Sequence, residues 1–251
     1  MTVPFQWIDP AMIPPLGWIY GRHYIRKFIT ETVAPSGLSL SIVEALAIST
    51  GRPLLGVVPK ERVNVWLLGE DPMDELQRRL AAACLHYGID PSEWEGHLSV
   101  DSGREQKIAI AEMADQVIDE IRANDFGVVI VENQLAASTW ADIADATNCS
   151  IDLVHHSRNA LVAKARSVRV FNGMTADEAA KAGVDNHRSF FRMDTGEGNL
   201  EWRRFVSVDL VNCDDVEVVV PWEWPNAQTA KPAPNRRAKL TYPPVPGDRR
   251  C

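Results

Sequence analysis

A strand, a short turn and a helix follow one another directly in Lys27–Gly51, and this succession most constrains the fold. Phe28–Val33 is rich in β-branched and aromatic residues, which favours a strand. Ala34-Pro35-Ser36-Gly37 is typical of a turn, and Leu38–Ser49 has the apolar pattern of a helix. The N–H groups of such a turn and of the helix N-terminus together form an anion site. The stretch therefore predicts the framework of a phosphate-binding loop.

The residues that would bind a phosphate are missing from this framework. A loop of this type reads G-x-x-x-x-G-K-[ST], in which the lysine reaches the β/γ-phosphates and the hydroxyl reaches Mg²⁺. Here Gly37 is followed by Leu38-Ser39-Leu40-Ser41, and the next lysine is Lys60. A Rossmann dehydrogenase is excluded as well, because no G-x-G-x-x-G follows the first strand.

The rest of the chain alternates further strands and helices. The predicted strands are Arg62–Leu68, His97–Val100, Phe126–Glu132, Ser150–His155, Ser167–Phe171, Ser189–Met193, Arg204–Leu210 and Val216–Trp224. The predicted helices are Met73–Tyr87, ended by Gly88, Lys107–Asn124, Leu135–Thr147 and 176–182, which Thr175 and Glu178 cap and Gly183 ends. This alternation predicts an α/β fold with a mostly parallel central sheet flanked by helices. The turn residues DTGEGN predict a small antiparallel extension near the C-terminus.

Several stretches resemble one known family, the RecA-type ATPases described as AAA family ATPases, which are relatives of the RepA-type hexameric replicative helicases of plasmids and phages. The stretches are GRHYIRKFITETVAP (21–35), LSIVEALAISTGRPLLG (40–56), LGEDPMDELQRRLAAACLHYGIDP (68–91), IDLVHHSRNA (151–160) and MTADEAAKAGVDNHRSFFRMD (174–194). The resemblance covers most of residues 18–225. It implies a RecA-like P-loop NTPase fold, ATP and Mg²⁺ as cofactors, a hexameric homo-oligomer and single-stranded DNA as a partner.

The resemblance also implies where the nucleotide would bind. Relatives typically have APGGVGKSSL at the turn, so this chain is about five residues shorter there and lacks the lysine. The positions that remain for cofactor binding are Pro35, Ser36, Gly37, Ser39 and Ser41.

Acidic residues follow two of the predicted buried strands. Glu70 lies just past Arg62–Leu68, at the end of a strand where open α/β sheets place their chemistry. It matches the family's glutamate that polarises the attacking water, although an acidic residue before Pro72 and a helix also favours that helix dipole. Glu132 ends Phe126–Glu132, where relatives have an aspartate that holds the Mg²⁺ water. Glu132 is therefore either a metal-site residue or simply a soluble strand end.

Two further positions carry roles that the resemblance implies. His156 follows Ser150–His155 at the place that senses the γ-phosphate in relatives, and the alternative is a histidine with a purely structural role. Arg192 lies in a strand and turn that, in relatives, supply basic groups to a neighbouring subunit's nucleotide. Glu197 stands where relatives have a lysine in that turn. A Gly/Ser-rich DNA-facing loop of relatives is missing after Asn159, which leaves Arg158, Lys164 and Arg166 as candidate basic contacts or as a solvated face.

Composition sets limits on the organisation and the location of the chain. No apolar run is long enough to span a membrane, and four scattered cysteines without C-x-x-C spacing favour reduced thiols and a cytoplasmic location. The net charge of −8 argues against a wholly nucleic-acid-coating surface but leaves room for a local basic channel. Residues 1–20 are expected to be an irregular lead-in packed on the surface and residues 21–225 the RecA-like domain. Residues 226–251 are expected to be a disordered Pro-rich basic tail, either inert or weakly attracted to nucleic acid.

Two functional hypotheses follow. The first is an ATP-driven DNA helicase or translocase in the replication of a plasmid or phage element. The second is a catalytically inactive RecA-like binding or scaffold module, which the missing lysine, Glu132, the missing DNA loop and Glu197 favour. The sequence predicts weak ATP binding at best and hydrolysis near background.

Overall fold

The computed structural model describes residues 3–34, 37–104, 110–132, 137–157, 165–194, 200–210 and 215–225. Its strands are β1 Trp18–Tyr20, β2 Tyr24–Ile25, β3 Ile29–Val33, β4 Asn64–Gly69, β5 Leu98–Ser102, β6 Phe126–Glu132, β7 Ser150–His155, β8 Ser167–Gly173, β9 Phe190–Asp194, β10 Leu200–Val208 and β11 Val216–Pro221. Its α-helices are α1 Ser39–Thr50, α2 Met73–Tyr87, α3 Ile110–Ala123, α4 Ala137–Thr147 and α5 Ala176–Ala182. Short 3-10 helices include η1 Pro10–Met12, η2 Leu54–Gly56, η3 Pro91–Glu93 and η5 His187–Ser189.

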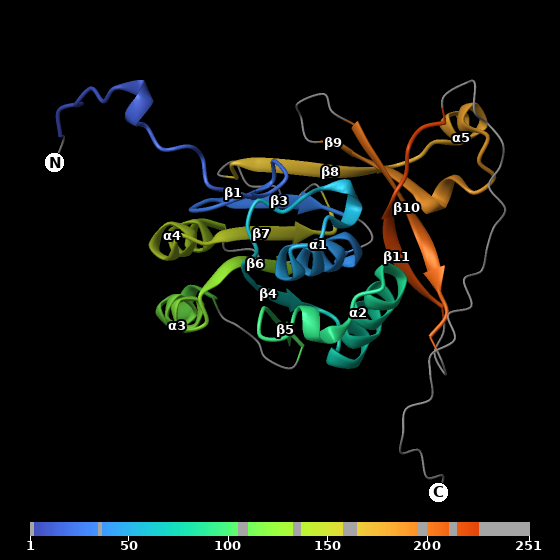
Figure 1. The fold of residues 1–251 in the computed structure, drawn as a ribbon, viewed down its shortest axis with the longest axis horizontal. Helices are drawn as coiled ribbons and strands as arrows, with labels where there is room; N and C mark the ends of the chain where they lie inside the picture. The colour runs from blue at the N-terminus through green and yellow to red at the C-terminus, as the bar shows by residue number, and fades with distance from the viewer. Residues whose placement is uncertain are drawn as a thin grey trace, which may run out of the picture.

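Within the described residues, one nine-stranded sheet runs through the molecule in the order β11-β10-β9-β8-β3-β7-β6-β4-β5. The pairs from β8 to β5 are parallel, and the pairs that join β8, β9, β10 and β11 are antiparallel. A separate hairpin of β1 and β2 lies beside them (Figure 1). The predicted α/β fold, with a mostly parallel sheet and a small antiparallel C-terminal extension, is confirmed.

Helices cover the parallel sheet on both faces, with α1 and α2 on one side and α3 and α4 on the other (Figure 1). Neighbouring residues of β4 belong to different cores because side chains alternate along a strand. Val65 and Leu67 join the core that contains α1 and α2, whereas Trp66 and Leu68 join the core of α3 and α4. Continuous apolar strands were the sequence signature of this arrangement, since parallel strands are buried on both faces.

Four predicted elements have exact bounds, whereas the predicted strand Arg204–Leu210 is observed as Leu200–Val208. Met73–Tyr87, Phe126–Glu132, Ser150–His155 and the helix over 176–182 have the predicted bounds. Gly88 and Gly183 adopt the left-handed conformation that ends a helix, as their positions predicted. Thr175 and Glu178 form the predicted capping box.

The structure differs from prediction near both ends of the chain. The lead-in is irregular only to Gly17, because Trp18–Tyr20 pairs with Tyr24–Ile25 and most of these side chains are buried. Val3–Leu16 is exposed and does not pack on the surface as expected. Strand β11 ends at Pro221, before Trp224, and one further backbone bond, from Trp222 N to Trp202 O at 3.2 Å, follows it. The predicted helix starts at Lys107 and Leu135 and the predicted tail, 226–251, lie outside the described residues.

Two further observations concern membrane-spanning segments and the state of the cysteines. Across the described ranges, no helix is long and apolar enough to cross a membrane. Cys84 and Cys149, which both belong to the described part of the chain, are free thiols.

Substituting Gly127 with alanine is expected to lower the free energy of unfolding by about 1–3 kcal/mol, the usual cost of overpacking. A Cβ at this position in β6 would lie 2.7 Å from Val63 Cβ, a contact that requires a backbone shift. Gly173→Ala is the matched control, because a Cβ there meets nothing within 4 Å. Urea denaturation of both variants measures the difference. Equal stability of the two variants would contradict the packing argument.

Candidate functional site

Four of the predicted site residues meet at the edge of the sheet where the parallel strands end. Glu70 directly follows β4, Glu132 ends β6, His156 directly follows β7, and Gly37 lies in the turn after β3. Parallel strands end at the same edge, which is where open α/β sheets bind ligands. The structure therefore brings together Gly37, Glu70, Glu132 and His156, which lie far apart in the sequence.

Glu132 is the centre of this group. Its Oε2 accepts a hydrogen bond of 2.8 Å from the backbone N–H of Glu70, and its Oε1 lies 3.2 Å from His156 Nε2. A Cβ built on Gly37 would lie 3.0 Å from the same Oε1 and 3.2 Å from His156 Cε1. The side chain of Glu132 is 4% exposed, whereas that of His156 is 45% exposed. The carboxylate thus points inward against the turn, and the imidazole lies between it and solvent.

Burial raises the pKa of Glu132 above its usual range, and the charges of Asp71 and Glu70 act in the same direction. The hydrogen bond from the Glu70 N–H and the charge of His156 act against this shift without cancelling it. The ionised form of Glu132 is therefore less stable in this position than it would be in water.

The turn before α1 is tight. Gly37 has φ +64°, a conformation that favours glycine, and its N–H donates to Ala34 O at 2.9 Å. Leu38 is the N-cap of α1 and provides no side-chain cap. The Gly37 N–H is therefore already engaged within the chain and is not directed at a ligand.

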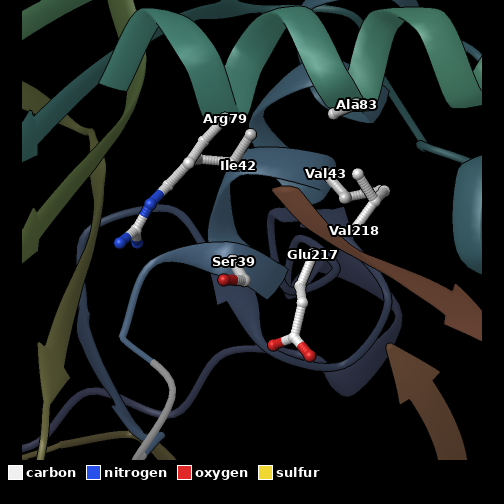
Figure 2. Close-up of a pocket in the computed structure, with 7 residues that line it drawn as sticks. All are labelled: Ser39, Ile42, Val43, Arg79, Ala83, Glu217 and Val218. Carbon is white, nitrogen blue, oxygen red and sulfur yellow. The ribbon is translucent and has the colours of Figure 1, made fainter. Parts of the chain in front are cut away.

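Beside the start of α1 lies a shallow depression between α1, α2 and β11 (Figure 2). Ser39, Arg79 and Glu217 are its polar lining residues. Arg79 also forms ion pairs with Asp71 and Glu75 at 3.0 Å. The one cation of this lining is thus neutralised by carboxylates, so the depression has no excess of positive charge for a phosphate.

These residues do not fit a triphosphate with Mg²⁺. The turn is closed on itself, a carboxylate lies against Gly37, and no lysine occurs between Lys27 and Lys60. Among the described residues, no three His, Cys, Asp or Glu side chains gather closely enough to hold a metal ion. A bound anion would meet the charge of Glu132 where it needs N–H groups and a cation.

The other predicted cofactor-binding residues have different surroundings. Ser41 is fully buried in α1, and its Oγ has no hydrogen-bond partner among the described residues. Pro35 and Ser36 lie outside the described residues. The binding roles of Pro35, Ser36, Gly37, Ser39 and Ser41 remain predictions.

Arg192 is not part of the Glu132 group. It lies in β9, where its Nη1 donates to Glu178 and its guanidinium lies 5.8 Å from the ring centre of Trp202. Its role toward a neighbouring subunit remains a prediction, and Glu197, Arg158 and Lys164 lie outside the described residues.

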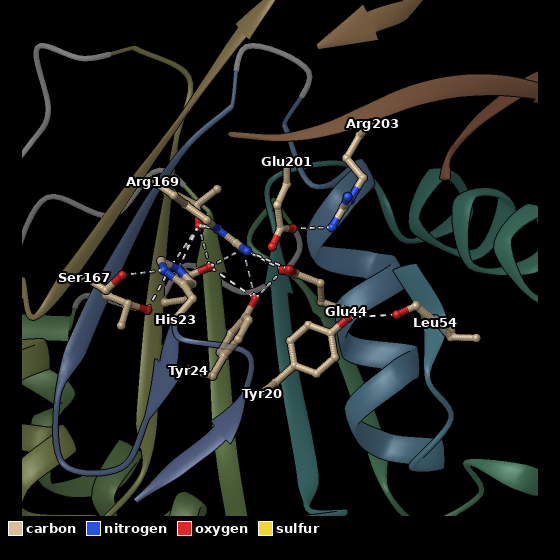
Figure 3. A network of polar contacts seen from close by, with 12 residues as sticks. Tyr20, His23, Tyr24, Glu44, Leu54, Ser167, Arg169, Glu201 and Arg203 are labelled. Atoms are coloured by element: carbon tan, nitrogen blue, oxygen red, sulfur yellow. Dashed lines mark hydrogen bonds and ion pairs between the residues drawn. The ribbon is translucent and has the colours of Figure 1, made fainter. Parts of the chain in front are cut away.

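A buried polar network, which sequence reasoning missed, joins α1 to the strands beside it (Figure 3). Arg169 of β8 donates from Nη1 and Nη2 to the two carboxylate oxygens of Glu44 in α1, both at 2.6 Å. Its Nε donates to Thr32 Oγ1 in β3 at 2.8 Å. Tyr24 Oη of β2 donates to Glu44 at 2.9 Å. A two-pronged arginine–carboxylate pair of this kind fixes direction as well as distance.

Asp152 of β7 is the second carboxylate of the network. It accepts from Thr32 Oγ1 at 2.8 Å, and its Oδ1 lies 3.0 Å from His23 Nε2. The other ring nitrogen of His23 lies 3.1 Å from Ser167 Oγ. A neutral His23 that donates to Asp152 and accepts from Ser167 satisfies every one of these contacts.

Opposing effects set the charges of this network. Burial acts to raise the pKa of Asp152. The charge that His23 carries when it is protonated at acid pH, its hydrogen bond, the charge of Arg169 and the Thr32 hydroxyl outweigh burial and hold this pKa well below its usual range. Burial and the charge of Arg169 lower the pKa of His23. Burial likewise opposes the charge of Arg169, and Glu44 outweighs it, which raises the pKa of the guanidinium. Asp152 and Arg169 are therefore charged, and His23 is neutral at pH 7.

The sequence contained one signal for this network. Glu44 is the one charged residue of a largely apolar helix, Asp152 lies in the apolar run of β7, and Arg169 lies between Val168 and Val170. Charged residues are rarely buried unless they are paired. Their positions indicated partners in the core, although the pairing itself was not readable from spacing.

Replacing Arg169 with methionine is expected to lower the free energy of unfolding by about 3–5 kcal/mol, because Glu44 and Asp152 would stay buried without their cation. Arg78→Met is the control, since the pairs of Arg78 with Asp74 and Glu75 are partly exposed and their loss should cost about 1 kcal/mol or less. Urea denaturation measures both. If Arg169→Met does not fold, Tyr24→Phe provides a milder loss of about 1 kcal/mol. Stability of both network variants equal to that of the parent would contradict the role of the network.

Replacing Glu132 with glutamine is expected to raise the melting temperature at pH 7, because a neutral amide avoids the cost of a buried charge. A raised carboxyl pKa means that stability is lost as the pH rises through that pKa, and glutamine removes this loss. The gain should therefore vanish below about pH 4.3, where the unfolded chain is also protonated. Thermal unfolding between pH 4 and pH 8 measures the effect, with exposed Glu223→Gln as the control. A gain that is independent of pH would refute the titration of Glu132 as its cause.

Comparisons with known proteins place the chain in a family. A family profile described as an AAA domain matches residues 1–138, which is more than half of the chain. No curated protein matches the sequence. The matched region includes β3, the turn at Gly37, α1, Glu70 and Glu132. Because this profile covers more than half of the chain, and the sheet has a RecA-like α/β arrangement, the chain belongs to the AAA domain family.

Proposed function

We propose that this chain is a RecA-like, RepA-related protein that acts in the replication of a plasmid or phage element through binding, with a degenerate nucleotide site. In this proposal it works in the cytoplasm as a homo-oligomer, hexameric by resemblance to its relatives. It binds other components of the replication machinery, single-stranded DNA among them, and does not convert ATP hydrolysis into movement.

One observation supports the proposal: the turn before α1 is closed by a hydrogen bond and has a carboxylate beside it. Gly37 N–H is bonded to Ala34 O, and the Glu132 carboxylate lies against Gly37. A triphosphate needs N–H groups, a lysine and a metal ion at this place. A negative charge in that position repels the ligand, and several such losses together leave little catalysis.

The active helicase is the second candidate, and one observation favours it. Glu70, Glu132 and His156 lie together around Gly37, where relatives are implied to polarise water, hold Mg²⁺ and sense the γ-phosphate. A gathering of this kind is expected of a chain descended from an active enzyme. The same arrangement is also expected in a chain without the activity, because the hydrogen bond of Glu132 to Glu70 N–H and its contact with His156 hold the three residues together.

Calorimetry with ATP and Mg²⁺ distinguishes the two candidates. We expect no detectable binding by the unmodified chain, and binding by a variant in which GVGKSS is inserted after Ser36, because the insertion restores the lysine and a longer loop. The same insertion with alanine in place of its lysine is the matched control.

Micromolar ATP binding by the unmodified chain would overturn the proposal in favour of the ATPase. If the inserted variant binds only when it contains the lysine, the framework is competent and the phosphate-binding residues alone were lost.

A further inference from the structure

A serine, a histidine and an aspartate are hydrogen-bonded in series beside the first residue of β8. Ser167 Oγ is 3.1 Å from His23 Nδ1 (Figure 3), and His23 Nε2 is 3.0 Å from Asp152 Oδ1. With His23 neutral, its Nε2–H donates to Asp152 and its Nδ1 accepts from the Ser167 hydroxyl. A nucleophile, a base and a group that orients the base follow one another in the same order in enzymes that transfer acyl groups through a serine.

Asp152 is held as an oriented carboxylate. Thr30 Oγ1 donates to its Oδ1 at 3.2 Å, and Thr32 Oγ1 donates to its Oδ2 at 2.8 Å. Arg169 lies 3.5 Å from Oδ2, the oxygen that His23 does not contact. The carboxylate is therefore ionised, fully buried and fixed against the imidazole, as the group that orients a catalytic histidine must be.

The backbone N–H of Ser167 is directed away from β3. Arg166 N donates to Ile29 O of that strand at 2.9 Å, and successive N–H groups of a strand point to opposite sides. On the other side, the described pairing of β8 with β9 extends from Val170 to Gly173 and does not reach Ser167. The N–H beside the nucleophile therefore faces a flank that the described ladder leaves open. The N–H of a nucleophilic serine is one of the donors that stabilise an oxyanion during acyl transfer.

Access to the three side chains differs. Asp152 is fully buried, His23 is 6% exposed and Ser167 is partly exposed. Water is therefore kept from the pair that activates the serine, while the serine itself can be reached from the surface. Because the serine is only partly exposed, the substrate class is a small ester whose carbonyl carbon approaches from the open flank.

We propose that Ser167, His23 and Asp152 form an acyl-transfer site that hydrolyses small esters, an activity beyond the proposed function and independent of ATP. Ser167 Oγ bonds to the ester carbonyl carbon, its proton passes to His23 Nδ1, and the carbonyl oxygen takes up the negative charge beside Ser167 N–H. The bond from the carbonyl carbon to the alcohol oxygen then breaks, and His23 returns the proton to that oxygen. Water repeats the sequence on the acylated serine, which releases the acid and restores the hydroxyl.

The charge of Arg169 limits the rate of this reaction. Burial disfavours a positive charge on His23, and Arg169 acts in the same direction and so lowers the pKa of the imidazole further. The imidazolium that forms during proton transfer is therefore less stable than it would be in a solvated site. We expect slow turnover, which covalent labelling of the serine detects more directly than steady-state hydrolysis.

A fluorophosphonate tests the site in the full chain without nucleotide. Ser167 Oγ bonds to phosphorus, fluoride leaves and the hydroxyl proton passes to His23, so peptide mass spectrometry should find the adduct on Ser167. Ser207 is the internal control, because it is exposed and lies 3.1 Å from a carboxylate oxygen of Asp215 rather than beside an imidazole. A parent chain without an adduct on Ser167, or with equal labelling of Ser207, would overturn the proposal.

Substitutions show whether His23 acts as the base. His23→Gln, which can still donate to Asp152, should slow the labelling of Ser167 by about a hundredfold, within the usual contribution of a general base. Ser207→Ala is the matched control and should be labelled at the rate of the parent. Circular dichroism checks the fold of each variant. Labelling of folded His23→Gln at the parent's rate would refute the assignment of the base.

A chromogenic ester provides a second measurement that does not depend on the histidine variant. The parent chain should release nitrophenol from p-nitrophenyl acetate in a burst of up to one equivalent, as the acyl group accumulates on Ser167. Ser167→Ala should lack this burst, whereas Ser207→Ala should retain it. Equal release by the parent and by Ser167→Ala would overturn the proposal. ATP calorimetry is unaffected by either result, so the nucleotide argument is tested separately.

Discussion

The buried pair of Glu44 and Arg169 is the interaction on which the rest of the structure depends. Both charges are almost completely removed from water, and each would be costly without the other. The pair joins the middle of α1 to β8, while Tyr24, Thr32 and Asp152 extend it to β2, β3 and β7. Helix α1 is buried along nearly its whole length, so apolar contacts alone do not fix its rotation. The network does, and it thereby sets where the turn at Gly37 meets Glu132.

This fixed framework bears on the proposal that the nucleotide site is degenerate. Glu70, Glu132 and His156 are positioned by the ends of three parallel strands, and strand ends do not move when a loop becomes shorter. With a turn closed at Gly37, the space beside it is taken by the carboxylate of Glu132. Burial then raises the pKa of this carboxylate, and the Glu70 N–H and His156 compensate in part. The fold is therefore insensitive to a change that removes the phosphate-binding residues.

The sequence predicted elements better than contacts. Phe126–Glu132 and Ser150–His155 were exact because continuous apolar runs between turn residues identify buried parallel strands, and Met73–Tyr87 was exact because its apolar period and Gly88 mark both ends. The gathering of Glu70, Glu132 and His156 followed from the topology once the strands were parallel. The partners of Glu44 and Asp152 were not predictable, since Arg169 is 125 residues from Glu44 and spacing contains no information on such pairs. The exposure of Val3–Leu16 was missed because apolar residues normally indicate packing.

The place of β3 in the sheet has a consequence for how the chain is made. Both of its neighbours, β7 and β8, come more than a hundred residues later, and β11, which contributes to the core of α1 and α2, comes last of all. During synthesis, Ile29–Val33 and the apolar α1 that follows are exported from the ribosome long before any strand exists to pair with them. The first half of the protein must therefore wait with its future core exposed, and folding is completed only when the C-terminal strands arrive. A chain of this topology depends on protection of its early segments during translation.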